Sequence, residues 1–142
     1  MDDLKGKRVT VAGLGHFGGG VSVARWLVSQ GARVLVTDVQ SAEALADSTR
    51  QLEGLPIDYR LGGHDERDFT HADLVVASPA IPPTNRYLSA AQAAGVPLTS
   101  EMRLFLERCP SRRVLAVTGT KGKSTTAALL HLMLQTVGKA WL

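Results

Sequence analysis

Residues 8–20 have the sequence RVTVAGLGHFGGG, in which an apolar run passes directly into a glycine-rich turn. The run at residues 8–12 predicts a buried strand, and residues 21–30 then carry apolar side chains at helical spacing. Between them, Gly13-Leu14-Gly15-His16-Phe17-Gly18 matches G-x-G-x-x-G, whose glycines let a backbone turn tightly and approach a diphosphate. The order strand, glycine turn, helix predicts a Rossmann-like nucleotide-binding unit.

Strands and helices are predicted to alternate along the rest of the chain, which favours an α/β fold with a parallel sheet. Asp38 ends the second predicted strand, where a carboxylate can accept hydrogen bonds from a ribose or a base. His64, which follows two glycines, is interpreted as a polar loop residue. The further strands are predicted at residues 34–37, 57–61, 74–77 and 97–100, and the further helices at residues 41–52, 85–94 and 101–108.

A second glycine-rich stretch, Gly119-Thr120-Lys121-Gly122-Lys123-Ser124-Thr125, lies between a predicted strand at residues 114–117 and an amphipathic helix. Its successive amides can form a concave nest for a triphosphate. Lys123 can reach the β- and γ-phosphates, and the Ser124 hydroxyl can ligate Mg²⁺. The stretch predicts the start of a P-loop ATPase domain, although Val117 stands where the motif G-x-x-x-x-G-K-[ST] has its first glycine. We therefore predict a Rossmann-like domain at residues 1–99 and a linker with the beginning of an ATP-binding domain at residues 100–142.

Composition narrows the classes of protein. The 142 residues are 44% hydrophobic and 20% charged with a net charge of +3, and the basic residues are scattered, so no nucleic-acid groove is indicated. A single cysteine, Cys109, excludes an internal disulfide framework and favours a reducing compartment. The polar amino terminus does not fit a signal peptide, and no run reaches the ~18 apolar residues of a membrane helix. These features predict a cytoplasmic protein without membrane insertion.

Residues 117–125 resemble the V-T-G-T-N-G-K-[ST]-[ST] loop of the Mur ligase family, and the rest of the chain resembles the amino-terminal portion of its D-glutamate-adding branch. Ser78-Pro79-Ala80-Ile81 is similar to the family's S-P-G-I loop, and Glu101-Met102-Arg103-Leu104-Phe105 is similar to its E-x-x-L-F segment. The order and spacing of these pieces agree over essentially the whole chain. The departures are Ala80 in place of glycine, Lys121 in place of asparagine, and the larger pair at residues 16–17 in the first glycine turn.

The resemblance implies two ligand sites. The first domain would hold the UDP part of UDP-N-acetylmuramoyl-L-alanine, with the diphosphate at Gly13, Leu14, Gly15, His16, Phe17 and Gly18, the uracil near Asp38, and the loop Ser78-Pro79-Ala80 facing the uridine. The second would bind ATP and Mg²⁺ at residues 119–125, with Lys123 as the catalytic residue.

The resemblance also implies an activity. The family phosphorylates the substrate carboxylate to an acyl phosphate, and the amine of D-glutamate displaces the phosphate to form an amide in peptidoglycan precursor synthesis. The family's long ATPase domain and its third domain have no counterparts in these residues, so the chain alone is predicted to be inactive.

Three alternatives remain at this point. An NAD-binding oxidoreductase domain would explain Gly13 to Gly18 and Asp38, but it leaves the second glycine stretch without a role. A related Mur ligase adding a different amino acid would share every motif found here. A non-catalytic module that senses a nucleotide would also fit a chain of this length.

Overall fold

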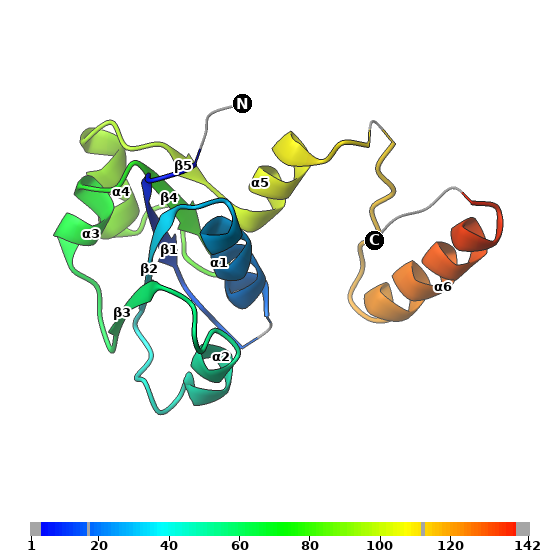
Figure 1. Cartoon of the computed structure of the whole chain (residues 1–142), viewed down its shortest axis with the longest axis horizontal. Helices are drawn as coiled ribbons and strands as arrows, with labels where there is room; N and C mark the ends of the chain where they lie inside the picture. The colour runs from blue at the N-terminus through cyan, green and yellow to red at the C-terminus, as the bar shows by residue number, and fades with distance from the viewer. Residues whose placement is uncertain (1–3, 17, 112, 139–142) are drawn as a thin grey trace. The chain divides into compact units, whose positions relative to one another are not determined.

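The computed structural model describes residues 4–16, 18–111 and 113–138. The chain divides into two compact units, one ending at Arg108 and the other beginning at Cys109. The first unit consists, in chain order, of β1 (Arg8–Ala12), α1 (Gly19–Ser29), β2 (Arg33–Asp38), α2 (Ala46–Arg50), β3 (Ile57–Leu61), α3 (Glu66–Thr70), β4 (Leu74–Ala77), α4 (Arg86–Ala93), β5 (Leu98–Thr99) and α5 (Glu101–Arg108). The sheet that we predicted is therefore present (Figure 1).

The five strands form one parallel sheet in the order β3-β2-β1-β4-β5. β1 is the central strand and is covered on both faces, since Val9 and Val11 on one face are each 1% exposed and Ala12 on the other face is fully buried. Val9 pairs with Val34 of β2 on one side and with Leu74 of β4 on the other. β2 and β3 follow one another on one side of β1, and the chain then crosses to the other side of β1 to form β4. This change of direction creates a topological switch point at the carboxyl ends of β1 and β4, where α/β proteins of this kind bind ligands.

Helices cover both faces of the sheet (Figure 1). α1, with the segments around Leu45 and Leu52, packs with Val11, Val36 and Val76 in the larger core cluster. α3 and α4 contribute to a smaller cluster, whose buried residues are Ala12, Phe69, Val75, Leu88, Ala91 and Val96. Both clusters reach the central strand, so the backbone at its carboxyl end is held from either face.

α5 belongs to the first unit and packs against α1. Leu104 is 3% exposed and lies in the larger core cluster. Arg108, at the end of α5, places its guanidinium 5.4 Å from the ring centroid of Trp26 on α1. The compact unit thus continues past the boundary after residue 99 that the sequence suggested, and that boundary stays a prediction.

The second unit contains α6 (Lys123–Thr136), preceded by residues 113–118 without regular structure. The strand predicted at residues 114–117 does not form, because the described residues of this unit contain no other strand with which it could pair. Leu115 is accordingly 67% exposed, and no described residue of α6 is buried.

Two other elements differ from expectation. α2 occupies only Ala46–Arg50 rather than residues 41–52, and residues 42–45 form a turn before it. The Ser41 hydroxyl accepts the amide of Ala44 at 3.4 Å, and the Ser41 carbonyl accepts the amide of Leu45 at 3.2 Å. α3 was not predicted, although Asp65 caps it by accepting the amide of Arg67 at 2.9 Å. Within the described residues, no helix is both long enough and apolar enough to cross a membrane.

Candidate functional site

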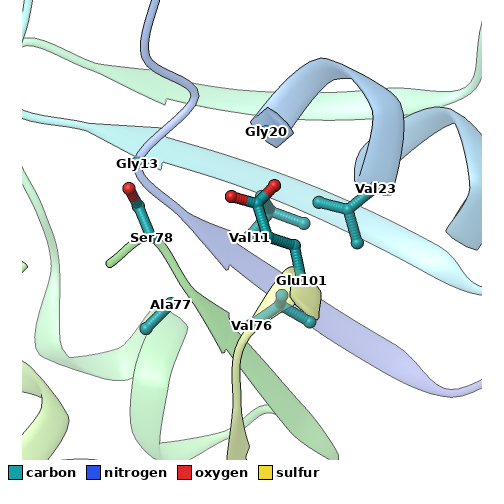
Figure 2. Close-up of a pocket in the computed structure, with 8 residues that line it drawn as sticks. All are labelled: Val11, Gly13, Gly20, Val23, Val76, Ala77, Ser78 and Glu101. Atoms are coloured by element: carbon teal, nitrogen blue, oxygen red, sulfur yellow. The ribbon is translucent and has the colours of Figure 1, made fainter. Parts of the chain in front are cut away.

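The loops after β1 and β4 meet at the switch point. The amide of Ser78 donates to the carbonyl of Ala12 at 2.8 Å, which extends the pairing of the two strands by one residue. Gly13 follows directly with φ 87°, and a Cβ placed on it would lie 2.8 Å from Cβ of Ser78. Only glycine fits this contact and this backbone angle. Figure 2 shows Ser78 and Gly13 side by side at the head of a small pocket. The structure therefore brings the first glycine turn and the Ser78 loop together, two segments that the family resemblance assigned to the same ligand.

Asp38, at the end of β2, holds the glycine turn in shape. Its Oδ2 accepts the amide of Leu14 at 2.8 Å and the amide of Gly15 at 3.3 Å, and its Oδ1 accepts the amide of Gln40 at 2.9 Å. The side chain is only 5% exposed. The sequence predicted a ligand as the partner of Asp38, and that role stays a prediction. In the structure its carboxylate is used mainly by the protein's own backbone.

This arrangement changes which backbone amides can receive a diphosphate. The amides of Leu14 and Gly15 are taken by Asp38, and the amide of Gly13 donates to the carbonyl of Thr37 at 2.8 Å. Leu14 also buries its side chain in the core. By contrast, the amides of His16 and of residues 18–20 have no hydrogen-bond partner among the described residues. These donors lie at the start of α1, where the helix dipole favours an anion. Phe17, which the sequence also placed here, is outside the described residues.

Gly20, at the start of α1, makes the close contact between this helix and the glycine turn. A Cβ on Gly20 would collide with the carbonyl oxygen of Leu14 and would lie 2.8 Å from that of Gly13. Gly18 has open space around it, and its requirement is a φ of 84° at the amino-terminal cap of α1. The glycine that close packing requires is thus Gly20, which lies two residues beyond the end of the hexapeptide motif. The run of three glycines at residues 18–20 was the available signal.

The loop Ser78-Pro79-Ala80 faces outward from the same edge of the sheet. Its turn is closed by Ser78, whose Oγ accepts the amide of Ala80 at 3.3 Å and whose carbonyl accepts the amide of Ile81 at 3.0 Å. No described non-glycine residue has a positive φ, so Ala80 fits its position without the backbone strain that replacing a turn glycine can cause. Pro79 and Ala80 are exposed and can contact a ligand.

An aromatic cluster formed by His64, Phe69 and Tyr87 contacts the carboxyl end of β2 through His64. His64, interpreted from the sequence as a loop residue, is half-buried, and its Nδ1 lies 2.7 Å from Oγ1 of the fully buried Thr37. Its ring meets Phe69 and Tyr87 edge to face, with ring centroids 5.5 and 5.1 Å away. Burial lowers the pKa of His64 below its usual value, while the charge of Asp38 acts in the opposite direction. Sequence periodicity could not reveal this cluster, because its members come from three separate segments.

The second glycine stretch forms a loop that leads directly into α6. Gly119 has φ 152°, and Gly122 has φ 78° and caps the helix. Nζ of Lys123 turns back over the loop and donates to the carbonyl oxygens of Gly119 at 2.7 Å and Thr120 at 3.4 Å. The two residues after Lys123, like the whole loop from Gly119, are exposed. The loop, the lysine and the hydroxyls are therefore adjacent and accessible at a helix amino terminus, a donor set that suits a phosphate chain with its metal ion.

Comparison with known proteins identifies the first unit. Residues 7–100 match the family model described as "Mur ligase MurD-like, N-terminal domain". This match covers β1 to β5, and therefore includes the glycine turn, Asp38 and the Ser78 loop.

Curated relatives extend the likeness to both units. The chain is 51% identical over 132 residues to the UDP-N-acetylmuramoylalanine–D-glutamate ligase of Roseiflexus sp. (strain RS-1), an alignment that covers 93% of this chain and 28% of the relative. It is 46% identical over 134 residues to the enzyme of the same name from Anaeromyxobacter dehalogenans (strain 2CP-C), again covering 93% of this chain and 28% of the relative. The chain thus spans little more than a quarter of the length of these relatives.

Solved structures show the same architecture. A UDP-N-acetylmuramate:L-alanyl-γ-D-glutamyl-meso-diaminopimelate ligase from Neisseria meningitides superimposes with a TM-score of 0.66 and 28% identity, covering 94% of this chain and 40% of that chain. A UDP-N-acetylmuramate–alanine ligase from Thermotoga maritima gives a TM-score of 0.62 and 29% identity, covering 94% and 30%. With the matched domain, the shared fold and the switch-point loops in agreement, the chain belongs to the Mur ligase family and carries its MurD-like N-terminal domain.

Proposed function

We propose that the chain supplies the UDP-substrate-binding domain and the ATP phosphate loop of an ATP-dependent ligase that adds D-glutamate to UDP-N-acetylmuramoyl-L-alanine in the cytoplasm. The observation that carries the proposal is the meeting of the glycine turn with the Ser78 loop at the switch point, in a chain 51% identical to a relative with that activity in its name. The complete activity belongs to a protein of the relatives' full length, and this chain alone is expected to be inactive.

Different residues of the first site would bind the diphosphate and the uridine. The diphosphate would bind at the amides of His16 and of residues 18–20, because those of Leu14 and Gly15 already serve Asp38. The uridine would lie between the Ser78-Pro79-Ala80 loop and the end of β2, where Val39 is 68% exposed. In this arrangement Asp38 fixes the turn, and its Oδ1 retains capacity for a further hydrogen bond.

The second site would hold ATP with Mg²⁺. The amides of Gly119 to Ser124 would surround the phosphates, Lys121 would add positive charge, and the hydroxyls of Ser124 and Thr125 would lie at the metal end of the loop. Lys123 would exchange its two loop carbonyl partners for phosphate oxygens. ATP supplies the phosphoryl group that activates a carboxylate, and Mg²⁺ offsets the charge of the phosphates.

Titration of the chain with UDP and with NADH tests the first site. We expect binding of UDP, seen as heat of binding and as an increase in melting temperature, because the first unit matches a domain of UDP-substrate ligases. NADH binding without UDP binding would favour the oxidoreductase alternative instead.

Lys123→Ala tests the second site. We expect it to weaken Mg-ATP binding by more than about tenfold, because one charge-assisted contact to phosphate contributes about 1.5–3 kcal/mol. Lys7→Ala removes the same charge from the first unit and should leave ATP binding unchanged. Equal ATP affinity of the wild type and Lys123→Ala would refute the phosphate-loop assignment.

A further inference from the structure

Glu101 places a carboxylate beside the proposed diphosphate site, although it comes from α5 rather than from the glycine turn. A Cβ placed on Gly19 would collide with both oxygens of this carboxylate, with Oε1 at 2.6 Å. Glu101 also lines one small pocket with Gly13, Gly20 and Ser78 (Figure 2). The carboxylate therefore reaches the start of α1 and the switch point together.

The position of this carboxylate is fixed by the packing of its helix. Leu104, one turn after Glu101, is anchored in the core at 3% exposure. At the far end of the helix, Arg108 lies over the ring of Trp26 on α1. Two anchors on one short helix hold α5 along α1, so Glu101 is kept near Gly19 by the fold.

The helix dipole favours a carboxylate at the start of α1, but the described residues offer it no direct polar partner. Among the described residues, neither of its oxygens accepts a hydrogen bond, and it takes part in no ion pair. The pocket that it lines measures about 10 Å³, which is about the space of one water molecule. A negative charge thus stands next to free amides that the proposed function assigns to a diphosphate.

We propose that Glu101 is a specificity-determining residue that opposes the diphosphate, so that the nucleotide part of the substrate binds weakly by itself and tight binding requires the rest of the substrate. This inference rests on the proposed function. A unit charge about 6 Å from a phosphoryl oxygen in a partly solvated site changes affinity by about threefold to tenfold. The effect grows with ligand charge and is absent for a neutral ligand.

The test compares uridine, UMP and UDP binding to wild type and Glu101→Gln by calorimetry at low ionic strength. We expect uridine to bind both proteins equally and UDP to bind Glu101→Gln about threefold to tenfold more tightly, with UMP in between. The gain should vanish in 1 M salt, where the screening length falls to about 3 Å. Glu107→Gln makes the same charge change at the other end of α5, where Glu107 pairs with Arg103, and should leave all three affinities unchanged.

The outcomes distinguish a failure of this inference from a failure of the proposed function. Equal or weaker UDP binding by Glu101→Gln, with uridine binding intact, would overturn the inference and leave the proposed function standing. Failure of all three ligands to bind either protein would overturn the proposed function and this inference with it. Glu101→Ala, which removes the charge and the bulk together, must change UDP affinity in the same direction and provides a second variant if Glu101→Gln unfolds.

Discussion

Replacing Asp38 by alanine should destabilise the glycine turn more than it destabilises any strand of the sheet. The substitution removes the acceptor of three amides, at distances of 2.8, 3.3 and 2.9 Å. The amide of Leu14 is buried, so its loss of a partner costs about 1–3 kcal/mol, whereas the longer bond from Gly15 is partly buried and contributes less. Water can replace the carboxylate at Gln40, which lies nearer the surface. We therefore expect Asp38→Ala to lower the free energy of unfolding by about 3 kcal/mol.

Urea denaturation followed by circular dichroism measures this loss, and the m-value should not change. For a unit of this size the melting temperature should fall by about 12–24 °C. Amide hydrogen exchange gives a local readout, since the amides of Leu14 and Gly15 should exchange faster than those of β1. Asp47→Ala removes a carboxylate that is 93% exposed and should have almost no effect. A loss below about 0.5 kcal/mol for Asp38→Ala would refute the view that the carboxylate holds the turn.

Two further predictions concern the surroundings of the turn. Gly20→Ala should destabilise the first unit by about 1–3 kcal/mol in the same urea assay, since the added Cβ would meet the backbone of Gly13 and Leu14. Ser22→Ala, on the exposed side of α1, is the control. Equal stability of the two variants would contradict the close contact at Gly20. Because burial lowers the pKa of His64 in the folded state, the unfolded chain binds the proton more readily, so stability should be complete above pH 6.5 and should decline as the pH falls through 6.5 toward the lowered folded pKa. Urea denaturation at pH 7 and pH 5 should show that decline in wild type and a smaller one in His64→Gln; identical pH dependence in both would remove His64 as its source.

Local sequence was sufficient for the central part of the fold. The apolar run at residues 8–12, the glycines after it and the acid at residue 38 depend on short-range patterns, and all three take their expected places. Parallel strands buried on both faces produce nearly continuous apolar runs, which is why β1, β2 and β4 were identifiable without an alignment.

The missed features depend on contacts between distant segments. The bonds from the amides of Leu14, Gly15 and Gln40 to Asp38 were not predicted, because the sequence does not show that these amides lie within reach of the carboxylate. Glu101 was noted only as part of an E-x-x-L-F segment, since its nearness to Gly19 requires α5 to pack along α1. The strand expected at residues 114–117 has suitable residues but no pairing partner among the described residues, and a parallel strand does not form by itself.

The internal bonding of Asp38 also has a kinetic consequence. Because the amides of Leu14 and Gly15 are bonded within the protein, this part of the turn keeps its shape between encounters, so an arriving nucleotide does not have to order it. Association should then proceed in a single concentration-dependent phase without a slow rearrangement afterwards. Ligands that bind at this end of the sheet would then differ mainly in their dissociation rates and much less in their association rates.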